Sequence, residues 1–167
     1  GPGASAAALD NWTLQTSSGT DTVTAVTVAL SAGSSGGLSL VEITNDTGGA
    51  VYGSAANPAS DTAAISLTTN IIATTTSTPY KVRITPKSHT AMPVPPGATY
   101  TVTGIVTEII STNDKRYYNT FSDTITIDNA SPGNAAWGAV SSGDAQIALN
   151  WTNPTDADFG GVIIIRN

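Results

Sequence analysis

The sequence predicts an all-β protein whose strands pair antiparallel and stack as a sandwich. Short segments of alternating apolar and polar residues recur about every 8–12 residues, the spacing of antiparallel strands joined by turns. No stretch of the sequence shows the 3.6-residue apolar period of a surface helix. Only 11% of the 167 residues are charged. Thr, which is frequent here, fits a pleated surface and keeps an exposed strand polar without charge.

The chain begins with a segment that predicts no regular structure. Residues 1–9 are mostly Gly, Pro, Ala and Ser, a composition typical of a flexible lead. Gly1 and Pro2 are typical of the scar that a protease leaves on an expressed protein. Residues 12–14 predict a short first strand. Residues 23–30 predict a longer one, with alternate aliphatic residues facing inward across an irregularity.

The next segments predict a hairpin. In residues 38–44, Leu38 and Leu40 alternate on one face, and Val41 and Ile43 lie on the opposite face. Residues 45–49 read Asn-Asp-Thr-Gly-Gly, which are residues that tight turns prefer, and residues 50–52 form the expected returning strand.

The remainder of the first domain predicts further strands and two prominent loops. In residues 80–85 apolar side chains alternate with Lys and Arg, which indicates a half-exposed strand. Residues 86–97 contain four prolines and must form a loop. Residues 113–119 predict a polar tip, and these two loops are the expected ligand contacts. The other strands expected in this part are 63–67, 99–110 and 121–127.

A second, shorter domain is expected after a linker. Residues 130–136 contain Ser, Pro and Gly and predict the linker, so the first domain spans residues 10–129. Within residues 137–167, Ile147, Leu149 and Trp151 alternate on one strand face, and residues 162–165 form an apolar run. Strands with such faces need further strands to cover them, so residues 137–167 are expected to be an incomplete module.

Two resemblances refine this prediction. Residues 147–154 (IALNWTNP) resemble the second strand of a fibronectin type III domain, in which a core Trp is followed by Pro, and residues 161–165 (GVIII) are similar to its third strand. Val162 stands where that family usually has Tyr. Residues 10–129, with their Thr-rich strands and closing TITIDN, resemble immunoglobulin-like repeats of bacterial surface proteins. Both resemblances imply a sandwich fold with a scaffold or adhesion role, and neither implies an active site.

Composition excludes several classes of function. The net charge of −6 leaves no basic footprint for nucleic acid. No run approaches the ~20 apolar residues that span a bilayer. Since the chain has no cysteine, disulfides, thiolate metal sites and Cys nucleophiles are excluded. His89 is the only histidine, and it follows Ser88 in a loop without a nucleophile-elbow motif, so we expect a solvated histidine and no enzyme.

One loop is a candidate calcium site. Asn153, Asp156 and Asp158 supply oxygens, which calcium prefers as ligands. The spacing is not that of an EF-hand. A hydrogen-bonded turn is the favoured interpretation and calcium the alternative. Asp128 and Asn129 at the linker are a weaker candidate of the same kind. No other cofactor is expected.

The sequence therefore favours a non-catalytic structural or adhesion module of a bacterial extracellular or cell-surface protein, with a protein or glycan ligand that it does not specify. The alternative is a subunit of a filament or assembly in which residues 144–167 self-associate by exchanging strands with a neighbouring chain.

Overall fold

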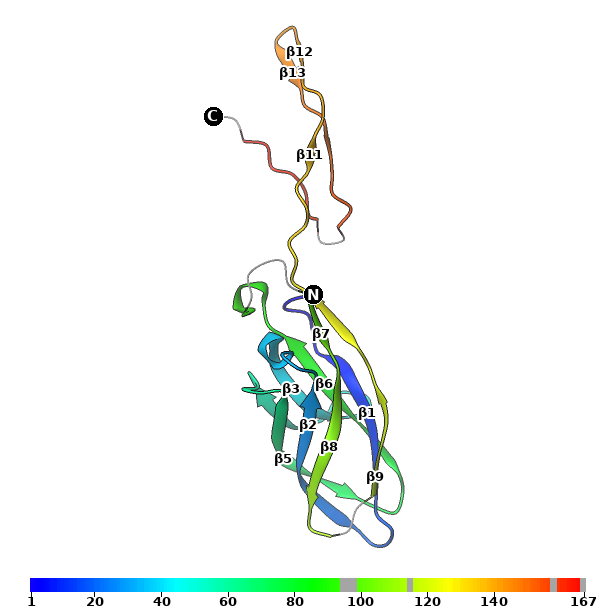
Figure 1. Ribbon diagram of the computed structural model, residues 1–167. Helices are drawn as coiled ribbons and strands as arrows, with labels where there is room; N and C mark the ends of the chain where they lie inside the picture. Colours follow the sequence, from blue (N-terminus) through cyan, green and yellow to red (C-terminus); the bar gives the residue numbers. More distant parts are fainter. Residues whose placement is uncertain (94–98, 114–115, 157–158, 166–167) are drawn as a thin grey trace. The chain divides into compact units, whose positions relative to one another are not determined.

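The computed structural model describes residues 1–93, 99–113, 116–156 and 159–165 (Figure 1). Contacts between Cα atoms divide the chain into two compact units, Gly1–Asn129 (unit 1) and Ala130–Asn167 (unit 2). The regular structure is almost entirely antiparallel β, which confirms the predicted fold class. No helix among the described residues is long and apolar enough to cross a membrane.

The described residues of unit 1 form ten strands and two short 3₁₀ turns. The strands are β1 (Ala7–Gln15), β2 (Asp21–Leu30), β3 (Leu38–Asn45), β4 (Val51–Ala56), β5 (Thr62–Ala73), β6 (Thr78–Pro86), β7 (Thr99–Val102), β8 (Gly104–Ser111), β9 (Arg116–Ser122) and β10 (Ile125–Asp128), and the turns are η1 (Ser35–Gly37) and η2 (His89–Ala91).

Eight of these strands form one continuous sheet that bends on itself. Their order is β8-β2-β5-β4-β3-β6-β1-β9, and β10 pairs with β7 separately. The bend lies between β4 and β5, which share a single pair, Gly53 with Leu67. A Cβ on Gly53 would lie 2.8 Å from the Ser66 carbonyl oxygen, so glycine allows the two backbones to approach here. Two layers result, β9-β1-β6-β3-β4 and β5-β2-β8.

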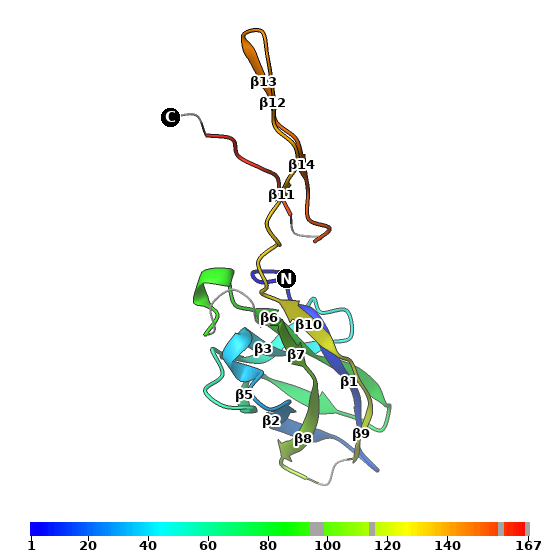
Figure 2. The same ribbon diagram turned by 45° about the horizontal axis from the view of Figure 1, so that its top comes forward.

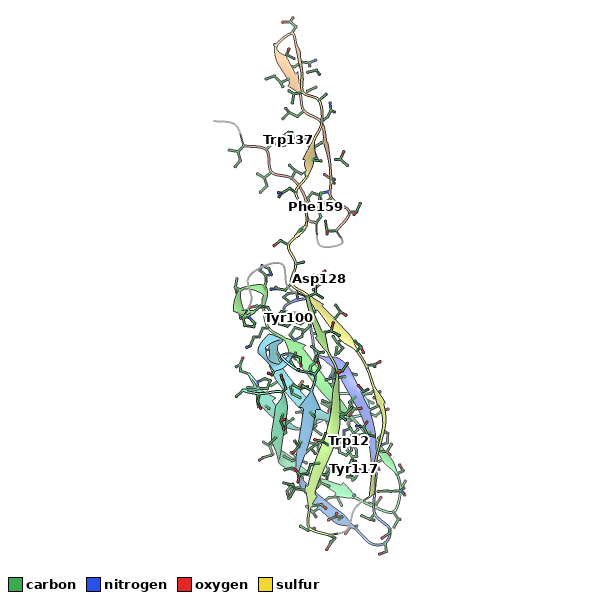
Figure 3. The ribbon with its side chains drawn as sticks, viewed as in Figure 1. Trp12, Tyr100, Tyr117, Asp128, Trp137 and Phe159 are labelled. Atoms are coloured by element: carbon green, nitrogen blue, oxygen red, sulfur yellow. The ribbon has the colours of Figure 1, made fainter. Side chains whose placement is uncertain are left out.

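One hydrophobic core lies between the two layers. Trp12 is fully buried in this core, and Figure 3 shows it in the same half of unit 1 as Tyr117. Its ring lies 5.1 Å from that of Tyr80, which in turn meets Tyr52 edge-on at 5.6 Å. The alternation expected in residues 80–85 is confirmed, because Tyr80, Val82 and Ile84 are buried while Lys81 and Arg83 are half-buried.

The 45–49 hairpin is also confirmed. The Gly48 N–H donates to the Asn45 carbonyl at 3.0 Å, and Gly48 has φ +76°, a conformation that glycine adopts freely. In the preceding strand the expected faces are correct for Leu40, Val41 and Ile43 but wrong for Leu38, which is fully buried like Val41 and Ile43 while Leu40 is half-buried. A register shift between Leu38 and Leu40 brings Leu38 onto the inner face.

Several strand boundaries differ from the predicted ones. Residues 7–9 belong to β1 instead of the flexible lead, because β1 pairs with both β6 and β9. The single strand predicted at 99–110 is divided at Thr103 into β7 and β8, which pair with different partners. The polar tip predicted at 113–119 is shorter, since β9 begins at Arg116.

The chain enters and leaves unit 1 at the same end. The start of β1 lies near the end of β6, with Ala7 opposite Ile84. The last residue of β10, Asp128, pairs with Thr99 at the start of β7. A Cβ on Gly1 would lie 3.9 Å from the Asp128 carbonyl oxygen. Figure 2 shows β10 beside β7 at this end. The turns after β1, β5 and β8 lie at the opposite end.

Unit 2 consists of two short ribbons and an extended tail. Its strands are β11 (Ala136–Trp137), β12 (Ser141–Gly143), β13 (Gln146–Ala148) and β14 (Trp151–Thr152), paired β11 with β14 and β12 with β13. The strand predicted at 145–151 is interrupted at Leu149 and Asn150. The strand predicted at 162–165 is not formed, because these residues join no ladder in the described part of the chain.

Candidate functional site

The candidate calcium residues of unit 2 face hydrogen-bond donors. Asn153 Oδ1 accepts the indole N–H of Trp151 at 2.9 Å, and Asp156 Oδ2 accepts the Gly133 N–H at 3.1 Å. Asp158 lies outside the described residues. Within the described residues, no three His, Cys, Asp or Glu side chains gather as a metal site would require. The Asn153 contact is local, as in a hydrogen-bonded turn, whereas the Asp156 contact joins residues 23 apart in the sequence, and calcium binding stays a prediction.

The second calcium candidate lies at the end of β10. Asp128 Oδ1 accepts the Thr99 hydroxyl at 3.4 Å, across the β7–β10 pair, while Asn129 is 1% exposed. The bond between Thr99 and Asp128 joins the end of β10 to the start of β7.

The proline-rich loop after β6 is anchored to the loop before β3. Lys87 donates from Nζ to the Gly36 carbonyl at 2.9 Å and from its backbone N–H to Gly37 at 2.9 Å. Met92 is buried against this loop. His89 is exposed, and the Ser88 hydroxyl contacts Thr90 at 3.4 Å. Residues 94–98 of the predicted ligand loop lie outside the described residues.

The opposite end of unit 1 is organised by Asp21. Its Oδ1 accepts the Asn113 N–H at 2.8 Å and the Thr112 hydroxyl at 3.0 Å, which ties the β8–β9 turn to β2. Burial of Asp21 opposes ionisation, but hydrogen bonds from Ser111, Asn113 and Thr112 outweigh it and lower the pKa of this carboxyl. Part of the predicted 113–119 contact loop is thus held rigidly, and residues 114–115 are outside the described part.

The outer face of the β5-β2-β8 layer is broad and nearly uncharged. Its strands carry two charged residues, of which Asp21 is buried and Glu108 is exposed. Ile72, Ile105 and Ile110 are 42–55% exposed on this face. The remaining exposed or half-buried residues of these strands are uncharged, mostly small or hydroxylated side chains: Thr22, Thr24, Ala25, Thr27, Ala29, Thr62, Ala64, Ser66, Thr68, Thr69, Asn70, Thr107 and Ser111. We call this surface the neutral face.

The other layer presents a different outer surface. Lys81, Arg83 and Glu42 lie on it, and Lys81 pairs with Asp46 at 3.2 Å. Arg83 donates to the carbonyls of Gly48 and Ala6. The two faces of unit 1 therefore differ in charge, and the neutral face is the one that a partner could cover without desolvating ion pairs.

Unit 2 exposes its large apolar side chains. Trp137 and Trp151 are register partners and are 67% and 38% exposed, and both line an open groove with Val162. Ile147, Ile163 and Ile165 are 69–86% exposed. The face expected from the alternation of Ile147 and Trp151 is thus not covered by any described residue of unit 2.

Sequence reasoning missed two buried carboxyls of unit 1, that of Asp21 described above and that of Asp10. Asp10 is 1% exposed on β1, and its Oδ2 accepts the Val106 N–H at 3.0 Å. A signal was present in the sequence, because Asp10 shares the parity of Trp12 and Leu14, which face inward. The prediction that the first strand begins at residue 12 concealed that pattern, since β1 spans Ala7–Gln15.

Comparisons with known proteins were made for the whole chain. No protein-family model, no curated protein and no solved structure matches it.

Proposed function

We propose that this chain is a non-catalytic structural or adhesion module of a bacterial extracellular protein, immunoglobulin-like in unit 1 and fibronectin-III-like in unit 2. The neutral face carries this proposal. A surface of methyl and hydroxyl groups, with Glu108 as its one exposed charge among the described residues, can be covered by a partner at modest desolvation cost when the buried hydroxyls find hydrogen-bond partners.

The path of the chain through unit 1 supports a displayed module. Segments that join unit 1 enter and leave at one end, beside the β7–β10 pair. The neutral face and the turns held by Asp21 are then left free of the connections on either side. Strands β1 and β9 are antiparallel neighbours, so tension between the two ends of unit 1 would separate their ladder one bond at a time. That geometry suits presentation of a surface better than the bearing of load.

Matched charge insertions test the proposal. Thr22→Lys puts a cation on the neutral face, and Thr13→Lys puts the same charge on the outer face of β1 in the other layer. Both threonines are half-buried strand residues. The probes are an immobilised neutral polysaccharide and a gelatin-coated surface, with labelled full chain. We expect one of the two probes to retain the chain. Thr22→Lys should lower the affinity for that probe at least about tenfold, the equivalent of about 1.4 kcal/mol, whereas Thr13→Lys should leave it unchanged.

Equal loss in the two variants would count against the neutral face as the contact. Absence of retention on both probes would count against adhesion to either class of surface.

A second candidate function follows from unit 2. The proposed alternative is an assembly subunit in which residues 144–167 pair with a neighbouring chain, since Val162 to Ile165 present an extended apolar segment outside any described ladder. Light scattering during size exclusion separates the candidates. Oligomers that grow with concentration and disappear in Ile163→Asp/Ile165→Asp support assembly, and a concentration-independent monomer contradicts it.

A further inference from the structure

The sandwich of unit 1 has one seam without a backbone ladder. Strands β8 and β9 are the two edges of the eight-stranded sheet. They follow one another in the chain, yet no backbone pairing joins them among the described residues. Side chains bridge them instead: Tyr117 Oη donates to the Thr107 carbonyl at 3.2 Å, and Asn119 Nδ2 donates to the Val106 carbonyl at 3.4 Å.

Asp10 completes this seam from inside. A register shift between Ala8 and Asp10 on β1 accompanies the burial of both Leu9 and Asp10. The carboxyl reaches β8 through the bond from the Val106 N–H to Oδ2. Its other oxygen, Oδ1, is buried with no donor in hydrogen-bonding geometry among the described residues. Oδ2 therefore has a donor in good geometry and Oδ1 has none in the described part of the chain, although the Asn119 amide and the Asn11 N–H lie near enough to the carboxyl to favour its ionised form.

Among the charged side chains that the structure describes, none lies opposite Asp10 to compensate its ionisation. On β6, Lys81 and Arg83 flank the opposing Val82 but bond on the outer surface, to Asp46 and to the carbonyls of Ala6 and Gly48.

On β8 and β9, too, the charged and titratable side chains that the structure describes form contacts away from Asp10. On β8, the Glu108 carboxylate meets the Thr27 hydroxyl on the neutral face. After β9, Asp123 contacts β1 through its backbone N–H to Leu9. On β9, Tyr117 is engaged with Thr107. The side chain of Arg116 lies outside the described residues.

The electrostatics agree with this geometry. Burial raises the pKa of the Asp10 carboxyl from 3.8 to about 6, although the Val106 N–H, the Asn119 amide and the Asn11 N–H act in the opposite direction. Since the folded pKa lies above the unfolded one, the stability that protonation contributes is complete below about pH 3.8 and is lost as the pH rises through about 6.

We propose that Asp10 is a pH-sensitive joint of the sandwich: the protonated carboxylic acid closes the seam between β1, β8 and β9, and its ionisation loosens that seam. Loosening means that β8 separates more readily from β1, on which Asp10 lies, and from β9, while the β2–β8 ladder persists. In the protonated form one carboxyl oxygen bears the proton and the other is a carbonyl oxygen. Neither is charged, so the cost of burying a charge disappears.

Urea unfolding across pH tests the joint. In the full chain, the unfolding equilibrium constant is measured at several values between about pH 2 and pH 7.5 for the natural protein, for Asp10→Asn and for Asp21→Asn. Asparagine keeps the shape of the side chain and an acceptor oxygen for Val106, but it does not ionise. We expect the ratio of the constants for the natural protein and Asp10→Asn to change on the order of 100-fold across this range, in the direction of relative stabilisation of the variant at higher pH.

Asp21→Asn is the matched control, because Asp21 is as buried as Asp10 but its pKa is lowered. Its pH dependence should have the opposite sign: the stability contributed by Asp21 is present at neutral pH and is lost as the pH falls below the usual Asp range. A flat ratio for Asp10→Asn, or a ratio with the sign of the Asp21 control, overturns the proposal.

A second measurement does not depend on a variant that folds. The carboxyl carbon of Asp10 is followed by NMR in the natural protein, together with the exchange of the Val106 and Val28 amides corrected for intrinsic rates. We expect a midpoint near pH 6 and faster opening of Val106 above it, with Val28 unchanged. A midpoint near 3.8, or equal acceleration of both amides, contradicts a local joint.

Discussion

At the scale of the residue, Trp12 is the largest side chain that the fold buries completely. Its ring packs on Tyr80, but its Nε1 has no hydrogen-bond partner among the described residues. Burial of the ring stabilises the core, while the unpaired N–H costs part of that gain.

Substitutions at Trp12 separate these two effects. Trp12→Ala is expected to lower the free energy of unfolding by about 3–5 kcal/mol, because it leaves a cavity between the layers. Trp12→Phe keeps much of the ring volume and removes the unpaired N–H, so it should cost less than half as much. Urea unfolding monitored by circular dichroism gives both values. If Trp12→Phe costs as much stability as Trp12→Ala, removal of the unpaired N–H brings no gain, and the close packing of the indole ring alone explains why Trp stands here.

Sequence reasoning was successful at this scale where side chains alternate regularly. Val26 and Val28 on β2, and Val82 and Ile84 on β6, are buried as their periodicity predicts. It was not successful at Leu38 and Asp10, because register shifts change which face a residue occupies. Such shifts depend on the partner strand and leave little trace in the strand's own sequence.

At the scale of the element, the bend between β4 and β5 decides the architecture. Gly53 is the residue that permits it, since a Cβ there would meet the Ser66 carbonyl oxygen at 2.8 Å and the Leu67 Cα at 3.1 Å. Both contacts are with backbone, which cannot move aside without distorting β5. A flat sheet at this point would not bring β2 and β8 over the inner face of β3 and β6.

Gly53→Ala is therefore expected to destabilise unit 1 by about 1–3 kcal/mol through overpacking. Gly49→Ala, in the hairpin between β3 and β4, is the control, because a Cβ there meets only the Thr47 hydroxyl at an ordinary 3.5 Å. Thermal melts of the two variants provide the comparison. Equal melting temperatures would mean that β5 adjusts to the extra methyl group without cost.

The sequence predicted the elements better than their ends. Turn residues at 45–49 revealed the hairpin, since its geometry depends on local chemistry. The division of 99–110 into β7 and β8 was not predictable from alternation, because it follows from pairing with two different strands, β10 and β2. The failure at 162–165 is of the same kind, since an apolar run becomes a strand only with a partner.

At the scale of the whole molecule, the two units differ in what they bury. Unit 1 encloses a continuous core, whereas unit 2 exposes Trp137, Ile147, Ile163 and Ile165. The sequence was enough to predict the fold class and to show that charges are few. It was not enough to locate the neutral face, because that face depends on the pairing of β2 with β5 and β8. The sequence could not assign that face, because its residues come from three distant segments.

The central claim is that unit 1 is a self-supporting sandwich and that unit 2 adds no core of its own. Amide hydrogen exchange of the full chain, resolved by residue, tests it most directly. Amides in the ladders of β2 and β6 should exchange only through global opening, on the order of 10³-fold or more slowly than those of residues 136–165. Protection of residues 136–165 equal to that of β2, in dilute monomeric protein, would contradict the account.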